Sequence, residues 1–337
     1  MIKADIIVGL QHGDCGKGKV AHHLAKTQDY THVIRYNGGC NAGHTIFHQG
    51  VKVVTHHIPA GVFFGIKSII GPGCVLDVNK FFHEINVLSE VIGPSVRDMI
   101  KVANNVHIIK EEHLSEDSTD EKLGTTKSGN GPAYRDKYSR TGTRAHEIED
   151  LKPFLVDMYE ELHNDDDVRV LFEGAQGFSL DIDWGDYPYV TSSHCTVAGA
   201  LLNGVPPQSV QNVWGIAKIY ETYVGTKNFQ PNDPVFNKIQ QVGKEFGATT
   251  GRTRQCNWLN WDNLEKAINI NGVTSLVFNK MDVLREVGVW GIIYKGEEKI
   301  FNSENDMKRW IQSKVYANAS FTRPAPVIYF SESPEHL

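Results

Sequence analysis

Residues 4–20 read ADIIVGLQHGDCGKGKV, an apolar run followed by a segment rich in glycine and lysine. The apolar part, Ala4–Gly9, is typical of a buried strand. The segment after it indicates a tight turn and a helix that begins near Lys17. A strand, a loop and a helix in this order bind phosphate, because the first amides of the helix point toward the anion. The sequence therefore predicts a phosphate site directly after the first strand.

The loop Gly13–Val20 nearly matches the G-x-x-x-x-G-K-[ST] phosphate loop. It departs at Val20, which stands where the pattern has the hydroxyl that ligates magnesium. Asp14 is the candidate replacement, because a carboxylate beside triphosphate oxygens is a natural ligand for Mg²⁺. The plainer interpretation of the loop, taken alone, is a glycine-rich turn with solvated lysines.

The rest of the chain alternates strand-like and helix-like segments. Apolar β-rich runs recur at His32–Arg35, Val51–His56, Ser68–Ile70, Val168–Phe172, Val213–Tyr220, Ser275–Phe278 and Val327–Phe330. Helical patterns lie at Val78–Val91, Leu151–His163, Asp262–Ile270 and Ser303–Lys314. We therefore expect an α/β fold with a mostly parallel central sheet covered by helices on both faces. Two polar stretches, Glu111–Arg144 and Gly225–Arg254, are predicted to be long loops that are either functional or disordered. No repeat or linker divides residues 1–337, so we expect a single domain.

Composition narrows the class of partner. The chain is 40% hydrophobic and 22% charged with a net charge of -6, which gives no bulk attraction to nucleic acid or to an anionic membrane. Its five scattered cysteines fit reduced thiols, and the first residues lack the long apolar region of a signal peptide. No run approaches the roughly 20 apolar residues of a membrane span. These features predict a cytoplasmic protein that acts on small molecules.

Two more patterns supply candidate chemistry. Asn41–Thr45 places His44 on a turn at the ligand edge of the sheet, where a histidine can act as a general acid. Asn279–Asp282 is an N-K-x-D sequence after an apolar run, and the Asp282 carboxylate can accept hydrogen bonds from N1–H and the exocyclic amine of guanine. A single histidine among fifteen is more often structural, and a four-residue match also occurs by chance.

Arginine, amide and hydroxyl groups gather in three other segments. Thr249–Arg254 places two guanidinium groups beside a glycine turn, which suits bidentate capture of a carboxylate or phosphate. Glu173–Gly177 adds a carboxamide, and Tyr187–Ser193 adds a row of hydroxyls. Taken alone, these segments are turns or a solvated basic loop.

Taken together and in this order, the motifs resemble the adenylosuccinate synthetase family. The resembling blocks are Gly13–Lys19, Asn41–Thr45, Gly124–Thr126 with Gly131–Lys137, Phe172–Gly177 with Tyr187–Ser193, Thr249–Arg254 and Lys280–Asp282. They run from the first strand to near the C-terminus, so the resemblance covers almost the whole chain. With 337 residues, the chain is similar in length to the compact archaeal or phage branch of the family.

The resemblance implies a ligase that joins L-aspartate to C6 of a 6-oxopurine nucleotide. In the family, the γ-phosphate of GTP goes to O6 of inosinate, and the aspartate amine then displaces that phosphate. The resemblance also implies a Mg²⁺ ion and a homodimer with a shared active site, in which Arg140 reaches the substrate of the neighbouring subunit.

The family roles fall on matching positions of this sequence. The implied catalytic residues are Asp14 as the base at N1, His44 as the general acid, Gln176 as the group that orients O6, and Lys17. The implied triphosphate contacts are Gly13, Gly16, Lys17, Gly18, Lys19, Lys280, Asp282 and Ser331. The implied purine monophosphate contacts are Asn41, Thr125, Thr126, Arg140, Gln176, Thr191 and Val224. The implied aspartate contacts are Thr249, Thr250, Arg252 and Arg254, and the implied metal ligands are Asp14 and Gly43.

The chain also departs from the family pattern. His12 and Cys15 stand in place of a tryptophan and a glutamate, Lys127-Ser128 in place of glycine-arginine, and Thr226-Lys227 in place of glycine-proline. Ser333 stands where the family has the glycine that closes over the guanine base. These changes leave two alternatives open: GTP or ATP as donor, and inosinate or, as in the phage branch, deoxyguanylate as substrate. The retained Asp14 favours inosinate.

Two other classes of protein fit the sequence less well. A GTP-binding regulatory module would use the phosphate loop and Asn279–Asp282 but has no role for the Arg252 and Arg254 pair. A nucleic-acid-binding protein would carry a basic surface with aromatic side chains, whereas this chain is acidic overall.

Overall fold

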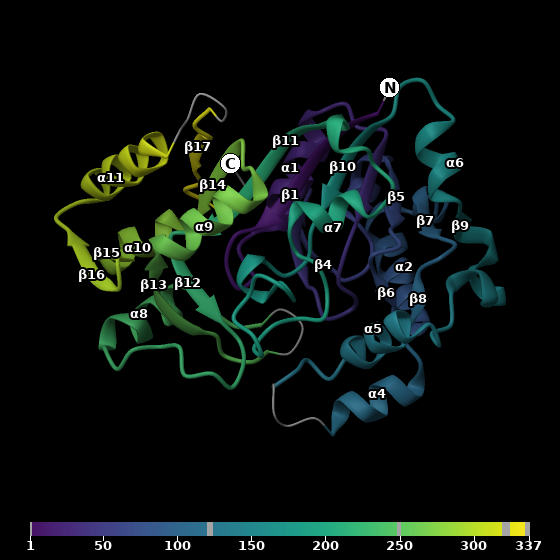
Figure 1. Cartoon of the computed structure of the whole chain (residues 1–337), viewed down its shortest axis with the longest axis horizontal. Coiled ribbons are helices and arrows are strands. Elements are labelled where there is room, and N and C mark those ends of the chain that lie inside the picture. The colour runs from purple at the N-terminus through teal and green to yellow at the C-terminus, as the bar shows by residue number, and fades with distance from the viewer. Residues whose placement is uncertain (1, 120–123, 248–250, 319–323, 334–337) are drawn as a thin grey trace.

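The computed structural model describes residues 2–119, 124–247, 251–318 and 324–333. Its centre is a nine-stranded sheet in the order β17-β14-β11-β1-β10-β2-β5-β7-β9 (Figure 1). Every neighbouring pair in this sheet is parallel. The strands are β1 (Lys3–Gly9), β2 (His32–Arg35), β5 (Lys67–Ile70), β7 (Ile100–Ala103), β9 (Leu155–Val156), β10 (Arg169–Glu173), β11 (Val210–Lys218), β14 (Ser275–Asn279) and β17 (Val327–Phe330).

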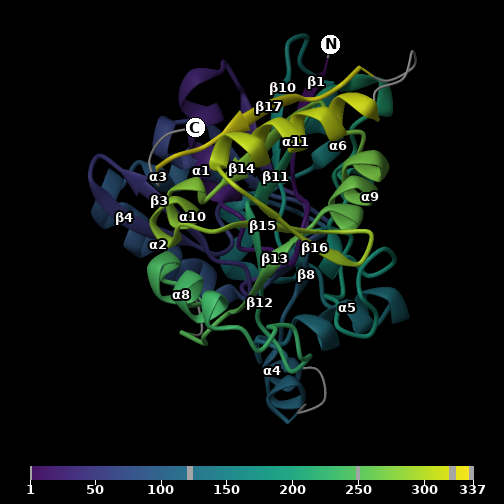
Figure 2. The ribbon, with the colours of Figure 1, turned by 90° about the vertical axis from the view of Figure 1, so that its left-hand side faces the viewer.

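Helices cover both faces of the sheet, as the sequence predicts. The chain first moves from β1 through β2 and β5 to β7, and later moves back through β10, β11 and β14 to β17. The connection between two parallel strands is right-handed. Helices in connections that run one way across the sheet therefore lie on one face, and helices in connections that run the other way lie on the opposite face. Figure 2 shows α1 (Lys17–Thr27) and α2 (Val78–Ile92) on one side, and α6 (Met158–His163) and α9 (Trp261–Asn271) on the other. The later crossovers also contain α7 (Val197–Leu201) and α11 (Glu304–Ala317).

The middle of the sheet forms the core. Strand β1 lies between β10 and β11, and Ile6, Ile7 and Phe172 are fully buried there. The side chains of a strand point alternately to the two faces of the sheet. Because helices cover both faces here, the fully buried middle positions along the strand must all be apolar. This explains why the sequence here reads as unbroken apolar runs.

Smaller elements surround the carboxyl ends of the central strands. A second sheet has the order β12-β13-β15-β16, made by Tyr220–Tyr223, Gln255–Asn260, Trp290–Tyr294 and Glu297–Phe301. The hairpin of β3 (His44–His48) and β4 (Val51–Thr55) packs on α1, and β6 (Val75–Leu76) pairs with β8 (His107–Ile108). In the part of the chain that the structure describes, the remaining helices are α3 (Val96–Met99), α4 (Glu111–Ser118), α5 (Asn130–Ser139), α8 (Pro234–Gly243) and α10 (Met281–Val287), with five short 3-10 helices that include η1 (Ala60–Phe64) and η3 (Glu149–Phe154).

Three expectations from the sequence are wrong in detail. The predicted helix Leu151–His163 is a 3-10 turn through Pro153, then the edge strand β9, and only then α6, because proline removes a helical amide. Glu111–Arg144 is not a long loop, since it contains α4 and α5. Gly225–Arg254 contains α8, which begins at Pro234 with Asp233 capping its first turn.

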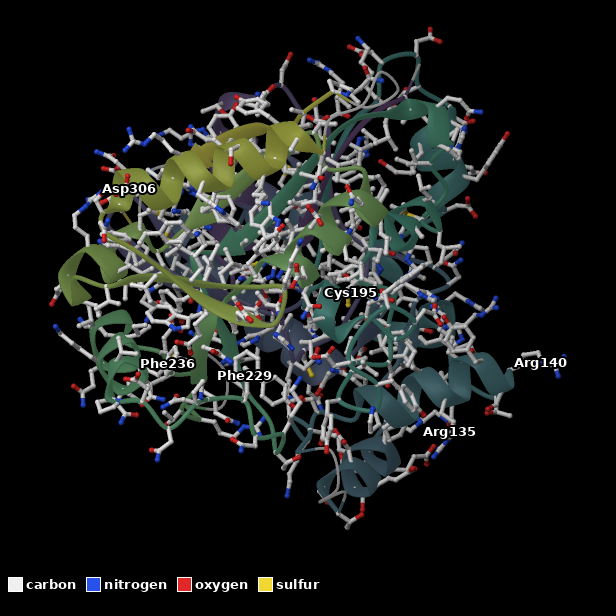
Figure 3. The ribbon with its side chains drawn as sticks, turned by 60° about the vertical axis from the view of Figure 1, so that its left-hand side comes forward. Arg135, Arg140, Cys195, Phe229, Phe236 and Asp306 are labelled. Carbon is white, nitrogen blue, oxygen red and sulfur yellow. The ribbon has the colours of Figure 1, made fainter. Side chains whose placement is uncertain are left out.

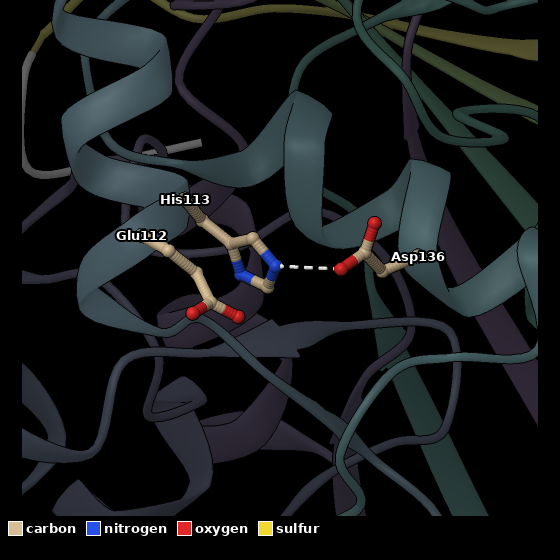
Figure 4. Close-up of side chains that lie close together, drawn as sticks. All are labelled: Glu112, His113 and Asp136. Atoms are coloured by element: carbon tan, nitrogen blue, oxygen red, sulfur yellow. Dashed lines mark hydrogen bonds and ion pairs between the residues drawn. The ribbon is translucent and has the colours of Figure 1, made fainter.

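A buried histidine explains why polar α4 folds. His113 is 1% exposed, its Nδ1 accepts the Lys110 amide at 3.0 Å, and its Nε2 pairs with Asp136 of α5 at 3.0 Å (Figure 4). Glu112 lies beside this pair, and the three residues together have the composition of a metal site. Both ring nitrogens are already engaged, so we assign the cluster to docking α4 on α5 rather than to a metal. Tertiary contact stabilises a helix whose sequence has little amphipathic pattern.

None of the helices in the described residues is long and apolar enough to span a bilayer.

Replacement of Phe81 tests the packing of α2. Phe81 is fully buried and makes an edge contact with Phe154 at 5.3 Å between ring centroids. Phe81→Ala should lower the free energy of unfolding by about 3–5 kcal/mol, because the surrounding core cannot close the cavity. The matched change is Phe82→Ala, one residue along on the half-buried side of the helix. Equal losses in chemical denaturation for the two variants would contradict this account.

Candidate active site

The carboxyl ends of the central strands meet at one large cleft. Four strands end in a charged or amide side chain, namely Arg35 of β2, Glu173 of β10, Lys218 of β11 and Asn279 of β14, and all four are buried. Loops that leave these strands line a cleft of about 1630 Å³. Ligand sites of parallel sheets lie at this edge, where the chain reverses direction across the sheet.

The predicted phosphate loop is present, and the Asn279 side chain holds it in place. Gly16 has a φ of 92° and caps α1, which begins at Lys17. The Asn279 amide donates to the Cys15 carbonyl at 2.7 Å, and a side chain at position 16 would meet that amide at 2.7 Å. Only glycine fits such a left-handed, crowded position. Lys17 is 4% exposed, and its ammonium donates to the Gln176 carbonyl.

The second half of the N-K-x-D sequence lies beside the phosphate loop. Asp282 is in the first turn of α10 and lines the cleft, while the Lys280 ammonium donates to the Gly243 carbonyl at 3.0 Å. Lys19 donates to Ser331 Oγ at 2.5 Å and to the Ser333 carbonyl at 3.1 Å. Burial lowers the pKa of Lys19 to about 8, against the opposing charge of Asp282. The C-terminal segment therefore closes onto the phosphate loop through Lys19.

His44 begins strand β3 instead of lying on a turn, and a buried carboxylate holds it. Its Nδ1 bonds to Glu173 Oε1, and Arg35 Nη2 donates to the same oxygen at 2.8 Å. The other oxygen of Glu173 accepts the Ala60 amide at 2.8 Å. Burial raises the pKa of Glu173, but Arg35 and His44 outweigh burial and lower it to about 2. Burial and then Arg35 lower the pKa of His44 to about 4, so the pair is a carboxylate and a neutral imidazole.

Asn41 and Gln176 meet on the cleft wall. Gln176 Nε2 donates to Asn41 Oδ1 at 3.1 Å, and the Gly39 amide donates to the same oxygen at 3.3 Å. Gln176 has a φ of 54°, a strained backbone for this residue type. Within the described residues its Oε1 is buried and accepts no hydrogen bond. An orphaned amide oxygen on a cleft wall fits a ligand that brings a donor.

Asp14 faces a guanidinium that is itself fixed by a second buried carboxylate. Arg254 Nε lies 2.9 Å from Asp14 Oδ2, and Arg254 Nη1 donates to Glu245 at 2.6 Å. Glu245 is fully buried and also accepts from Lys218 at 2.8 Å and Tyr220 at 2.6 Å. Burial raises the pKa of Glu245, but Lys218 and Arg254 outweigh burial and lower it to about 2. The group that touches Asp14 is therefore rigidly placed.

Of the other site residues that the family resemblance implies, most line the cleft and a few do not. Lining the same cleft are Gly13, Gly18, Gly43, Thr125, Thr126, Thr191, Val224 and Arg252. Arg252 donates to the Gly124 carbonyl at 3.0 Å, and Thr125 donates to Asp117 at 2.8 Å. Thr249 and Thr250 lie outside the described residues. Arg140 caps the far end of α5 and points away from the chain, so it does not line the cleft (Figure 3).

The sequence analysis missed the buried groups that hold the site. Arg35, Lys218 and Glu245 were not singled out, and Glu173 appeared only as part of a turn. A signal was present, because a charged residue that ends a fully apolar strand has nowhere to go except the ligand edge of the sheet. Glu245 follows a helix and gave no such signal.

A second cluster of acidic and histidine side chains lies outside the main site, and its buried carboxylate already accepts hydrogen bonds from the protein. Asp181, Asp183 and His194 lie close enough to hold a metal ion. However, Asp181 accepts the amides of Asp183 and Trp184 on one oxygen and that of Cys195 on the other, at 3.0, 3.1 and 2.6 Å. These bonds indicate a turn-forming role for Asp181.

Comparison with known proteins gives one consistent result. The adenylosuccinate synthetase family model matches residues 6–154 and 147–315. The adenylosuccinate synthetases of Caldanaerobacter subterraneus subsp. tengcongensis and Phocaeicola vulgatus are 35% and 39% identical to this chain, over 83% and 84% of it and 78% of each relative.

Two solved structures share the fold. The fully ligated adenylosuccinate synthetase of Plasmodium falciparum has a TM-score of 0.87 at 28% identity, covering 98% of this chain and 97% of that chain. The succinoaminodeoxyadenylate synthetase of cyanophage S-2L, bound to dGMP and dATP, has a TM-score of 0.77 at 22% identity, covering 99% and 94%.

Removal of the Glu245 charge tests the buried network. Glu245→Gln leaves Lys218 and Arg254 buried without their shared counter-ion, so the free energy of unfolding should fall by about 3–5 kcal/mol. Glu286→Gln, an exposed change on the rim of the same cleft, should stay within about 0.5 kcal/mol of the unmodified chain. Urea denaturation measures both. Indistinguishable stabilities would show that Glu245 does not hold the network.

Proposed function

Because this chain belongs to the adenylosuccinate synthetase family, and is therefore a ligase that forms a carbon–nitrogen bond, we propose that it joins L-aspartate to C6 of inosinate using GTP. The single observation that supports this most is the contact of Asp14 with Arg254 at 2.9 Å. It places a carboxylate of the phosphate loop against an arginine suited to a substrate carboxylate. In this proposal the triphosphate, purine and aspartate sites meet at this contact.

The first step activates the purine oxygen. Asp14 takes the proton from N1 of the base, which puts negative charge on O6, and O6 then attacks the γ-phosphorus of GTP and releases GDP. Gln176 orients O6, and Lys17 and Lys19 offset the charge on the phosphoryl oxygens. A purine O6 is otherwise a poor leaving group, whereas the 6-phosphoryl group leaves as phosphate. Fixed charges around a phosphoryl group are the main source of catalysis in such transfers.

His44 acts on the same phosphoryl group. With Nδ1 held by Glu173, Nε2 is the ring nitrogen that remains for the substrate. His44 acts as the general acid in its protonated form, which the negative charge of the bound phosphates favours. The carboxylate fixes the orientation of the ring, as buried carboxylates do for catalytic histidines in general.

The residues present fit a magnesium ion. Asp14 and the carbonyl of Gly43 both line the cleft beside the phosphate loop, and Mg²⁺ prefers one or two such oxygens together with phosphate. When bound, the ion neutralises charge that develops on the phosphates. The Asp14 side chain is 35% exposed, which leaves it accessible to a ligand.

The second step forms the carbon–nitrogen bond. The aspartate amine attacks C6, the C6–O bond breaks, and phosphate leaves with the proton that the amine gives up. Arg252 and Arg254, with Thr249 and Thr250, hold the aspartate carboxylates in this proposal. Nε and Nη1 of Arg254 already face Asp14 and Glu245, so Nη2 remains for substrate.

Lys280, Asp282 and Ser331 form the proposed guanine site. Asp282 lines the cleft beside Lys19, where an acceptor for N1–H and the exocyclic amine would favour GTP over ATP. The Asn279 amide nitrogen holds the phosphate loop through the Cys15 carbonyl, so we assign the reading of the base to Asp282.

The assembly we propose is a cytoplasmic homodimer of one domain per chain, with no nucleic acid or membrane partner. Arg140 projects from the end of α5, away from its own cleft, so it contributes to the partner's monophosphate site together with Asn41, Thr126 and Thr191. The five cysteines are free and buried, which fits a reducing compartment.

A second candidate substrate is deoxyguanylate. The observation that favours it is Cys15, a small buried residue next to Asp14 at a position where the family has glutamate. Space at this point would accommodate the 2-amino group, and the donor would then be ATP, dATP or GTP.

The substrate pair is tested by kinetics. Each pairing of inosinate or deoxyguanylate with GTP or ATP, together with aspartate and Mg²⁺, should give the highest kcat/KM for inosinate with GTP. The 2-amino group of deoxyguanylate needs an acceptor, and an unpaired buried donor costs about 1–3 kcal/mol, or roughly 5–150-fold. A higher kcat/KM for deoxyguanylate would select the second candidate, and equal use of GTP and ATP would remove the base-reading role of Asp282.

Mixing two inactive variants tests the shared site. Asp14→Asn should lower turnover by at least about 10²–10⁴, because it removes a base and a metal charge from a nearly isosteric side chain. Arg140→Leu should also be inactive. Hybrid dimers carry one intact site, so an equal mixture should recover about a quarter of the unmodified activity. No recovery after subunit exchange, verified by mass, would contradict the dimer.

A further inference from the structure

Two departures from the family pattern meet at a single carboxylate. His12 and Lys227 lie on different loops, and both contact Oδ2 of Asp186. The distances are 3.2 Å from His12 Nε2 and 2.6 Å from Lys227 Nζ. We call His12, Asp186 and Lys227 the Asp186 link. Asp186 has both partners only because position 12 is histidine and position 227 is lysine.

Aromatic rings and a second carboxylate set the geometry of this link. His12 makes edge contacts with the rings of Tyr223 and Phe229 at 5.4 and 5.1 Å. The Lys227 ammonium lies over the same two rings at 5.3 and 5.6 Å. The far nitrogen of His12 lies 3.5 Å from Glu221, which is buried. His12 therefore has a carboxylate beside each ring nitrogen, and Asp186 is the point where His12 and Lys227 converge.

The three segments that meet here are the walls of the proposed purine site. His12 directly precedes Gly13 and Asp14, Asp186 lies in the loop that leads to Thr191, and Lys227 follows Val224. Asp14, Thr191 and Val224 all line the cleft.

Resting on the proposed function, we propose that Asp186 is a positioning residue for the purine monophosphate. By holding His12 and Lys227, it fixes the phosphate loop, the Thr191 loop and the Val224 segment at one spacing. The carboxylate is 43% exposed and touches no reacting atom, so its effect on binding passes through the three walls.

The strength of the link depends mainly on His12. An exposed ion pair such as Lys227 with Asp186 contributes little by itself, because solvent screens it. The His12 side chain is only 2% exposed, so its bond to Asp186 is screened less. In agreement with this order, His12 first and then Lys227 hold the pKa of Asp186 below its usual range. Loss of Asp186 should accordingly exceed loss of Lys227.

The test compares isosteric variants on the full chain. Asp186→Asn should weaken inosinate binding, measured by titration calorimetry, by about tenfold, the equivalent of one charge-assisted hydrogen bond. The KM for inosinate should rise in parallel, while kcat and the KM for GTP stay within about twofold of the unmodified chain. Asn279 and Gln176 hold the triphosphate part of the phosphate loop at Cys15 and Lys17, independently of Asp186. Lys227→Met should have a smaller effect. In the double variant, Lys227→Met should add nothing to Asp186→Asn, because Lys227 acts through Asp186.

The matched control is Asp183→Asn. Asp183 belongs to the same loop, is exposed, and pairs with His194 at 3.3 Å instead of with a wall of the cleft. Its inosinate affinity should stay unchanged. A purely structural role for Asp186 would lower the melting temperature and kcat together, without the selective change in the KM for inosinate.

The outcomes separate the two proposals. If the unmodified chain binds inosinate and Asp186→Asn binds it equally well, the positioning role is wrong and the proposed function stands. Additive effects of Asp186→Asn and Lys227→Met, or an equal loss in Asp183→Asn, would also overturn the role. If the unmodified chain binds deoxyguanylate and not inosinate, Asp186→Asn should weaken deoxyguanylate binding by the same factor, and unchanged binding would overturn the positioning role. If it binds no purine monophosphate, the proposed function is wrong, and this inference is wrong with it.

Discussion

The burial of β1, β10 and β11 on both faces is the constraint on which this molecule depends. Helices cover each side of these strands, so their fully buried middle positions are apolar and charged side chains occur toward the strand ends. Arg35, Glu173 and Lys218 are the last residues of their strands, and all three are buried at the edge where the cleft opens. The cleft is therefore built from charges that the sheet itself places within reach of a ligand.

Two buried carboxylates organise those charges. Glu173 bonds to Arg35, His44 and the Ala60 amide, and Glu245 bonds to Lys218, Tyr220 and Arg254. Buried ion pairs add little net stability, because desolvation offsets the attraction between the charges. Their benefit here is orientation. Groups that must face phosphoryl transfer are fixed before the substrate arrives, which is how preorganised sites lower a barrier.

Four of the departures from the family pattern lie at the edges of this charged centre. Cys15 adjoins Asp14, Ser333 contacts Lys19, and His12 and Lys227 meet at Asp186. Each lies beside a group to which we assign a substrate contact, and none replaces Asp14, His44 or Gln176. This distribution fits a reaction type that is fixed by the centre and a substrate choice that is set by its surroundings.

The sequence by itself determined the fold class, the phosphate loop and the family, because each rests on short-range patterns. An apolar run, a glycine that must adopt positive φ and the arginine pair are local properties of the chain. The strands of the large sheet at His32–Arg35 and Val327–Phe330 have the predicted bounds for the same reason. Tertiary structure alone decided which distant groups meet. Helix α4 folds through the contact of His113 with Asp136, and Glu245 becomes a site residue only when α8 and β13 bring it to Arg254 and Lys218. His12, Asp186 and Lys227 are separated by long stretches of sequence, and no local pattern links them. Their meeting depends on the packing of three loops, because a hydrogen bond needs an approach of about 3 Å that only the folded chain provides.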